Sequence, residues 1–148
     1  MKNAIIIYKS QTGTTKKFSE NIGVFLESCG IKTIVKSIAD ADPSEIGGYD
    51  YIILGCWTNG FLLMFQHPGK EWVEFAEKLD IPDSKKIILV TTYKICTGSM
   101  FRNMCRHLRL SENKQTVCTL KSRDGQLPES QKQLLSEAIC LSALHLST

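Results

Sequence analysis

The stretch "IIIYKSQTGTTKKFSENI" (residues 5–22) joins an apolar run to a helical pattern through a loop rich in hydroxyl groups. The continuous apolar run over 4–8 is typical of a strand that helices cover on both faces. From Thr14 onwards apolar residues recur at helical spacing, and the pattern closes at Gly30, a residue type common just after a helix end. The junction therefore predicts a strand, a polar loop and a helix in direct succession.

The alternation of strand and helix continues along the chain. Further strands are predicted at 32–38, 51–56, 86–92 and 115–120, with the first and last of these at the edges of the sheet. Helices are predicted at 14–29, 69–79, 97–110 and from Pro128 onwards, with one short helical turn at Pro43. Such alternation favours a parallel sheet with right-handed crossovers. We predict one doubly wound α/β domain over residues 1–148.

Composition limits the classes of function. The 43% hydrophobic and 22% charged content is ordinary for a globular protein, and no apolar run approaches the roughly 18 residues of a membrane helix. No small-residue cleavage site follows the N-terminal apolar run, so we expect a cytoplasmic protein with no membrane partner. The net charge of +3 is divided among separate basic clusters, which disfavours nucleic-acid binding.

The six cysteines and three histidines form no recognisable reactive group. No cysteine pair has the CxxC form or the close spacing of a zinc site, so reduced structural thiols are expected. The histidines stand at 67, 107 and 145 and suggest no Ser–His–Asp or metal constellation. We therefore predict neither catalytic side chains nor a metal ion.

The loop Ser10–Thr15 lies where the first strand ends, and doubly wound sheets bind their ligands at that end. The start of the following helix offers unpaired N–H groups and the positive end of a dipole, which suit a phosphate. A helix cap needs one hydroxyl, whereas this loop has four. Neither GxxxxGK[ST] nor GxGxxG is present. A bound phosphate would also offset the unfavourable position of Lys16 and Lys17 in the first helical turn.

The loop resembles the FMN phosphate loop of flavodoxins, which has the form [ST]-x-T-G-x-T after the first strand. "SQTGTT" (10–15) matches every defined position, and the chain length is similar to that of a short-chain flavodoxin. The resemblance implies a five-stranded sheet in the order 2-1-3-4-5, one FMN, and electron transfer between redox partner proteins. The implied phosphate contacts are Ser10, Gln11, Thr12, Gly13, Thr14 and Thr15.

In flavodoxins the flavin ring lies between the loops after the third and fourth strands. The residues implied after the third strand are Trp57, Thr58, Asn59 and Gly60. Trp57 would stack on the ring, with a core tryptophan as the alternative. Asn59-Gly60 is a turn dipeptide that would turn a carbonyl toward flavin N5, although it would serve any tight turn. A small group of flavodoxin-like proteins with Gly-x-Trp at this place resembles the chain more closely, and "GQLPES" (125–130) is similar to that group too.

Two further segments would lie near the ring. The apolar run "FLLMF" (61–65) has three open interpretations: a short covered helix, a cap over the dimethylbenzene edge, or a docking patch. The residues implied after the fourth strand are Thr92, Tyr93, Lys94, Cys96, Thr97 and Gly98, with Ile95 among them. Tyr93 would stack on the ring or pack below it, and Lys94 departs from the acidic residues of many flavodoxins. Cys96 lacks a CxxC partner, which disfavours a redox role.

The resemblance favours a monomeric FMN electron carrier, because the flavin supplies the chemistry and the protein supplies binding and electrostatics. The alternative is a small FMN-dependent reductase of a quinone or other acceptor, although such enzymes are usually longer. A module without FMN is disfavoured by the intact loop, and a receiver-type signalling domain by the absence of acidic residues after Tyr8.

The sequence pI of about 8.5 differs from the acidic character of most flavodoxins, so a different redox partner is expected.

Overall fold

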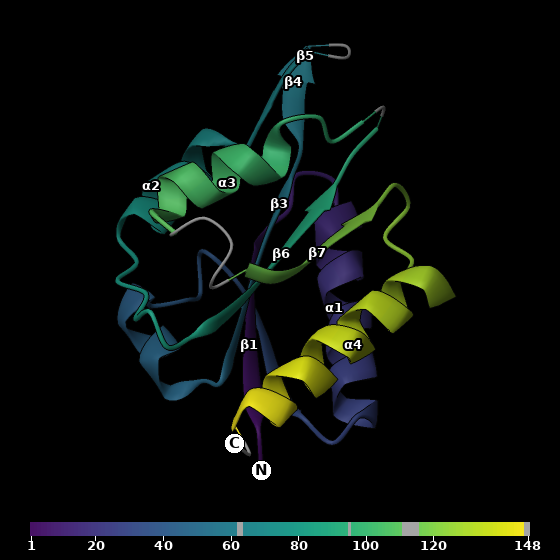
Figure 1. The fold of residues 1–148 in the computed structure, drawn as a ribbon. Coiled ribbons are helices and arrows are strands. Elements are labelled where there is room, and N and C mark those ends of the chain that lie inside the picture. The colour runs from purple at the N-terminus through teal and green to yellow at the C-terminus, as the bar shows by residue number, and fades with distance from the viewer. Residues whose placement is uncertain (62–63, 95, 111–115, 147–148) are drawn as a thin grey trace.

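The computed structural model describes residues 1–61, 64–94, 96–110 and 116–146. A five-stranded parallel sheet crosses the centre of the molecule in the order β2-β1-β3-β6-β7 (Figure 1). Its strands are β1 (Asn3–Lys9), β2 (Lys32–Ser37), β3 (Tyr51–Trp57), β6 (Lys86–Thr92) and β7 (Thr116–Ser122). The predicted order 2-1-3-4-5 is confirmed, with both expected edge strands in place.

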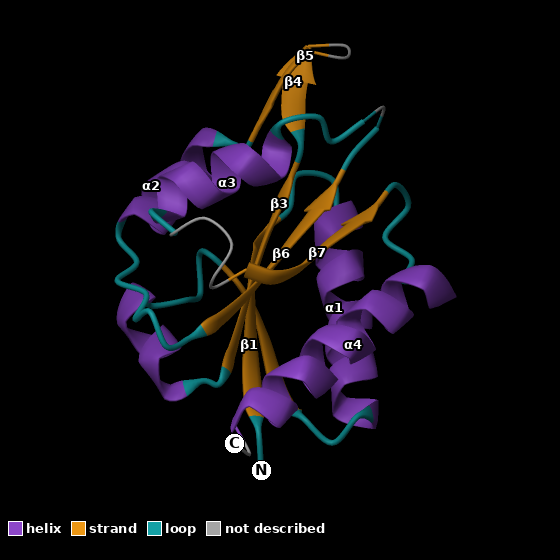
Figure 2. Cartoon of the chain, in the orientation of Figure 1, coloured by secondary structure: helices purple, strands orange, loops and turns teal. Residues whose placement is uncertain are grey.

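Helices cover both faces of the sheet (Figure 2). One face carries α1 (Thr14–Ser28) and α4 (Glu129–Leu146). The other carries α2 (Lys70–Glu77), α3 (Met100–Leu108) and a short 3-10 helix, η1 (Pro43–Gly48). The predicted helices therefore exist, with ends that differ from the sequence-based ones by at most three residues. None of the described helices is long and apolar enough to cross a membrane.

The central strands are continuous apolar runs because each face of the sheet has its own core. In β1, Ile5 and Ile7 pack beneath α2 and α3, whereas Ala4 and Ile6 pack beneath α1. All four side chains are fully buried, as the alternation of side chains along a strand between two covered faces requires. Each fully buried isoleucine contributes about 1.5–3 kcal/mol through the hydrophobic effect.

The connection after β3 differs from the prediction. Strands β4 (Asn59–Phe61) and β5 (Met64–His67) form an antiparallel hairpin that projects beyond the carboxyl end of the sheet (Figure 1). The covered-helix interpretation of 61–65 is therefore wrong for the described residues of this run, because Phe61 lies in β4 and pairs with Met64 in β5. Asn59 and Gly60 lie in β4 and do not form the expected tight turn. Residues 62 and 63 of the apolar run lie outside the described residues.

Candidate cofactor site

The Ser10–Thr15 loop leaves the start of α1 open. Gly13, the residue before the helix, has a φ of 93°, a left-handed conformation that favours glycine. Its N–H donates to Ser10 Oγ at 3.0 Å, which folds the loop on itself, and no side chain caps the helix. A Cβ placed on Gly13 would meet no atom within 4 Å. No side chain therefore caps the N–H groups of the first turn of α1, and the space beside Gly13 is open, as an anion site requires.

The hydroxyl groups of the loop divide between its outer and inner sides. Thr12 is exposed and Thr14 half-buried, and their Oγ1 atoms lie 3.4 Å apart. Thr15 is 1% exposed, and its Oγ1 lies 2.6 Å from Oγ1 of Thr92, which is itself buried at the end of β6. The loop thus offers two neighbouring hydroxyls to a ligand, while the hydroxyl of Thr15 anchors the loop to the sheet.

The two threonines that end β6 join the loops around the site. The carbonyl of Thr92 accepts a hydrogen bond from the N–H of Thr58 at 2.7 Å. Thr91 Oγ1 donates to the carbonyl of Cys56 at 2.7 Å and lies 2.8 Å from Thr58 Oγ1. The end of β6 therefore fixes both the loop before α1 and the segment after β3. Sequence reasoning missed Thr91, although a buried hydroxyl at the end of an apolar strand needs a partner.

Trp57 packs against the start of α2. Its half-buried indole contacts the apolar core beneath α2 and α3. A Cβ added to Gly69, the residue before α2, would lie 3.4 Å from Trp57 Cζ2. Gly69 therefore allows the backbone to approach the ring closely, and one side of the indole is occupied by the chain. Stacking of Trp57 on a flavin stays a prediction, as do contacts from Asn59 and Gly60.

The loop after β6 is attached to β7. The N–H of Tyr93 donates to the carbonyl of Ser122 at 3.2 Å, and the guanidinium carbon of Arg123 lies 5.8 Å from the centre of the tyrosine ring. This cation–π contact fixes the ring beside the end of β7. Lys94 is exposed. The predicted contact Ile95 lies outside the described residues.

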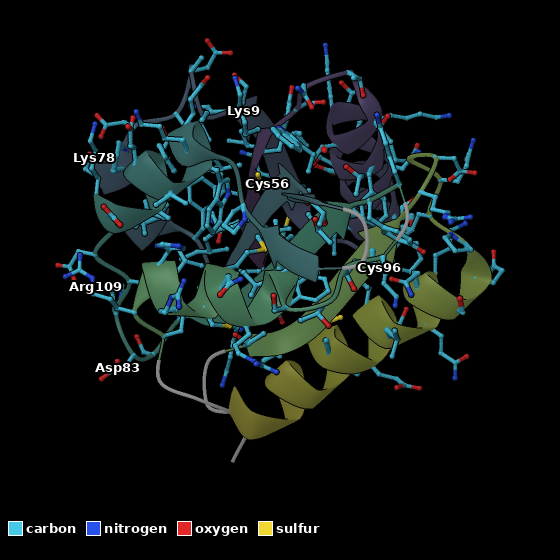
Figure 3. The ribbon with its side chains drawn as sticks, turned by 90° about the horizontal axis from the view of Figure 1, so that it is seen from above. Lys9, Cys56, Lys78, Asp83, Cys96 and Arg109 are labelled. Atoms are coloured by element: carbon cyan, nitrogen blue, oxygen red, sulfur yellow. The ribbon has the colours of Figure 1, made fainter. Side chains whose placement is uncertain are left out.

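The remaining loop residues lead into α3. Cys96 and Thr97 are half-buried, Gly98 is exposed, and the carbonyl of Thr97 accepts from the N–H of Met100 at the helix start. Figure 3 looks down on this end of the molecule, with Cys56 near the centre of the sheet and Cys96 in the loop after β6. The structure thus places the loops after β1, β3 and β6 at one end of the sheet, as the sequence predicted.

Sequence reasoning missed the connection between β7 and α4. Asn21 of α1 donates from its side-chain amide to the carbonyl of Gly125 at 2.8 Å. A Cβ on Gly125, whose φ is 86°, would lie 3.0 Å from Lys17 Cδ, so this turn packs on the lysine stem. Asp124 accepts from the N–H of Gln126, which lowers the pKa of its carboxyl group. The dipeptide Asp124-Gly125 was the available signal, because it is a common turn sequence.

The described side chains offer little chemistry of their own. Burial raises the pKa of the Cys56 thiol to about 12 and that of Cys118 to about 11, so both are protonated near pH 7 and are weak nucleophiles. All six cysteines are free thiols. Within the described part of the chain, no three His, Cys, Asp or Glu residues gather as metal ligands would. The clearest feature of this end is the uncapped start of α1 beside a loop that is hydrogen-bonded to the sheet.

A family model described as "Flavodoxin domain" matches residues 5–138. The chain belongs to the flavodoxin family. This confirms the family to which the residues of the first loop pointed. Flavodoxins bind FMN, so the predicted cofactor is confirmed as well. The Gly-x-Trp subgroup stays a prediction.

Similarity to individual flavodoxins is partial in sequence and extends over the chain in structure. The chain is 33% identical over 61 residues to a flavodoxin of Maridesulfovibrio salexigens, covering 40% of this chain and 42% of that protein. It is 39% identical over 79 residues to a flavodoxin of Synechococcus elongatus, covering 51% and 41%. The chain therefore spans about two fifths of the length of these curated relatives.

Solved flavodoxin structures share the fold. Two-electron reduced Megasphaera elsdenii flavodoxin superimposes with a TM-score of 0.71 at 21% identity, covering 91% of this chain and 96% of that one. Oxidised flavodoxin 2 of Bacillus cereus gives 0.66 at 21% identity, covering 97% and 99%. At this identity the likeness shows the fold, which agrees with the strand order.

Proposed function

We propose that this flavodoxin carries electrons between redox partner proteins, with FMN held at the carboxyl end of the sheet. The observation that supports this most strongly is the uncapped start of α1 behind a loop that the Thr15–Thr92 contact anchors to β6. FMN supplies one- and two-electron chemistry when it is bound. The protein would contribute binding, orientation and charge.

The phosphate would sit at the start of α1. The N–H groups of the first helical turn would donate to it, and the positive end of the helix dipole would stabilise its charge. The hydroxyls of Thr12 and Thr14, whose oxygens lie 3.4 Å apart, would donate to it as a pair. Ser10 would act indirectly, because its oxygen accepts from Gly13 and so holds the loop in shape. The open space beside Gly13 supports this placement, because a Cβ built there would meet no atom within 4 Å.

The ring would lie between the segments after β3 and β6. Among the described side chains, Trp57 and Tyr93 are aromatic residues of these segments, and each has a contact on one side, with Gly69 and Arg123 respectively. The exposed Lys94 would place a positive charge near the rim of the ring. The free thiols fit a reducing compartment such as the cytoplasm.

The proposed phosphate contacts can be tested by comparing two flavins. Thr12→Val/Thr14→Val removes both outer hydroxyls, so FMN should bind at least tenfold more weakly, because a single lost charge-assisted hydrogen bond of about 1.5 kcal/mol is worth about tenfold. Riboflavin, which has no phosphate, should bind almost unchanged. Thr33→Val/Thr119→Val on β2 and β7 is the matched control. Flavin fluorescence titration measures both affinities. Equal weakening of FMN and riboflavin would place the phosphate elsewhere.

Measuring the turnover of a small electron acceptor distinguishes an electron carrier from a reductase. Protein purified without added flavin should show the absorption of bound FMN. A carrier should pass electrons to a redox protein rapidly and show no saturable turnover of quinones with NADH or NADPH. Saturable quinone reduction would instead support the reductase.

A further inference from the structure

The outer surface of α3 is a stripe of arginines. Its buried side is formed by Met100, Met104 and Leu108, which pack on the sheet. The exposed positions are Arg102, Arg106 and Arg109, spaced as i, i+4 and i+7 so that they follow one side of the helix. We call these three residues the arginine stripe.

The stripe belongs to a segment from which acidic residues are absent. Between Asp83 and Glu112 the sequence has six Lys or Arg and no Asp or Glu. The other twelve Lys and Arg share the rest of the chain with all fifteen Asp and Glu, so that remainder has a net charge of −3. The net charge of +3 is therefore unevenly distributed: the chain is acidic outside this segment and strongly basic within it. Such local charge steers association with a partner of opposite sign.

Among the residues that the structure describes, two of the three arginines of the stripe have no acidic partner. At the C-terminal end of α3, His107 Nδ1 lies 3.6 Å from the carboxylate of Glu77, and Arg109 donates to the Glu77 carbonyl at 2.9 Å. Arg102 and Arg106 form no ion pair with any residue that the structure describes.

The position of Arg102 does not help the helix itself. A cation in the first turn, where Arg102 lies, opposes the helix dipole, and Arg102 also repels the like charge of Arg106 four residues away. Arg106 lies in the last turn, where a cation favours the helix. The stability of α3 therefore gives no reason for arginine at position 102, whereas a partner that neutralises its charge would give one.

The stripe lies beside the candidate cofactor site. Residues 93–99 connect the end of β6 to the start of α3, and α3 begins next to the hairpin that rises above the sheet (Figure 1). A protein docked on Arg102 and Arg106 would therefore approach the exposed Lys94 and the rim of the proposed flavin. Short separation from the flavin is what electron transfer between proteins needs.

We propose that Arg102 and Arg106, with Lys94, form the docking surface for an acidic redox protein. This rests on the proposed function as an electron carrier. Guanidinium groups form paired hydrogen bonds with carboxylates, which suits an acidic patch on a protein. A nucleic acid or an anionic membrane fits less well, because the net charge of −3 on the rest of the chain would repel an extended polyanion.

The test compares two electron acceptors of opposite charge. FMN-loaded, fully reduced protein is mixed in a stopped-flow instrument with an acidic blue-copper protein or with a basic c-type cytochrome. In each reaction the reduced flavin loses one electron, and Cu(II) becomes Cu(I) or Fe(III) becomes Fe(II). The rate constant with the copper protein should fall about tenfold or more as salt rises from 10 to 300 mM, because electrostatic steering is screened. The rate constant with the cytochrome should not fall.

The decisive variant is Arg102→Gln/Arg106→Gln. It should slow the reaction with the copper protein about tenfold at low salt and leave the high-salt rate unchanged, because charges in the docking surface act mainly on association. Lys85→Gln/Lys86→Gln removes the same charge near the opposite end of β6 and is the matched control, with an expected change below about twofold. An equal effect of the two variants, or no effect of either, would overturn the proposal.

A binding measurement separates this proposal from the proposed function. The Cu(I) form of the same protein is titrated into isotope-labelled protein, and amide shifts in α3 should move with a dissociation constant that the arginine variant raises. This titration tests the docking surface even if the absorption spectrum shows no FMN. The absence of FMN would count against the proposed function as an electron carrier and not against the docking surface. Tighter binding of a 20-base-pair DNA duplex or of phosphatidylserine vesicles through the same arginines would overturn the acidic-protein assignment.

Discussion

The hydrogen bond between Thr15 and Thr92 joins the phosphate loop to the sheet, and its removal should be measurable as a loss of stability. The two Oγ1 atoms are 2.6 Å apart, and the residues are 1% and 3% exposed. Thr92→Val replaces the hydroxyl with a methyl group of similar size, so no cavity forms. The hydroxyl of Thr15 then stays buried without this partner, which costs about 1–3 kcal/mol of unfolding free energy. For a domain of this size the melting temperature should fall by about 3–10 °C.

Two further variants make the prediction specific. Thr15→Val should cost a similar amount, whereas Thr15→Val/Thr92→Val should cost clearly less than the sum, because neither hydroxyl is then left buried alone. Thr58→Val is the matched control: it removes a hydroxyl next to Thr91, but Thr91 keeps the carbonyl of Cys56 as its acceptor. Its cost should stay below about 1 kcal/mol.

Urea unfolding of the flavin-free variants at pH 7 gives the four free energies of the cycle. The same variants should bind FMN more weakly than the wild type, since the loop loses its anchor, and Thr15→Val/Thr92→Val should not restore this affinity. Additive costs of the two single variants, or a cost of Thr92→Val no larger than that of Thr58→Val, would refute the reasoning that this bond holds the loop.

Two other predictions concern the proposed ring site. Trp57→Ala should increase the fluorescence of bound flavin and weaken FMN binding, because the indole both quenches and packs against the ring; unchanged emission and affinity would assign Trp57 to the core beneath α2. Lys94→Glu should lower the potential of the second one-electron reduction by on the order of tens of millivolts. A cation about 6–8 Å from the reduced ring, at an effective dielectric near 20, stabilises its negative charge by roughly 2–3 kcal/mol. Solvent screening removes more than half of this energy. Potentiometry at low ionic strength compares it with Lys85→Glu, and equal potentials in all three proteins would contradict the role given to Lys94.

Local sequence patterns were sufficient to locate the central strands and the first loop. A central strand with two covered faces is apolar along its length, so the apolar runs at 4–8, 51–56 and 86–92 could be recognised as central strands from the sequence. The first loop was equally readable, because a strand end, a helix start and the residues between them are neighbours in sequence. Strand order followed from the resemblance to a family, and the structure confirmed it.

The hairpin after β3 was decided by tertiary structure. Five consecutive apolar residues at 61–65 fit a buried helix or a strand equally well, since periodicity cannot separate the two over so short a run. The antiparallel pairing of β4 with β5 gives the described residues of this run hydrogen-bonding neighbours as strands. The same pairing places Asn59 and Gly60 in a strand, although as a dipeptide they favour a turn.

Tertiary structure, and not the local sequence, also decided which way each threonine hydroxyl of the first loop points. Thr12, Thr14 and Thr15 are chemically alike, and nothing in "SQTGTT" distinguishes the one that anchors the loop from the pair that can meet a ligand. The partner of Thr15 is Thr92, 77 residues further along the chain. A buried hydroxyl must find a hydrogen-bond partner, and only the folding of β6 beside α1 brings that partner within reach.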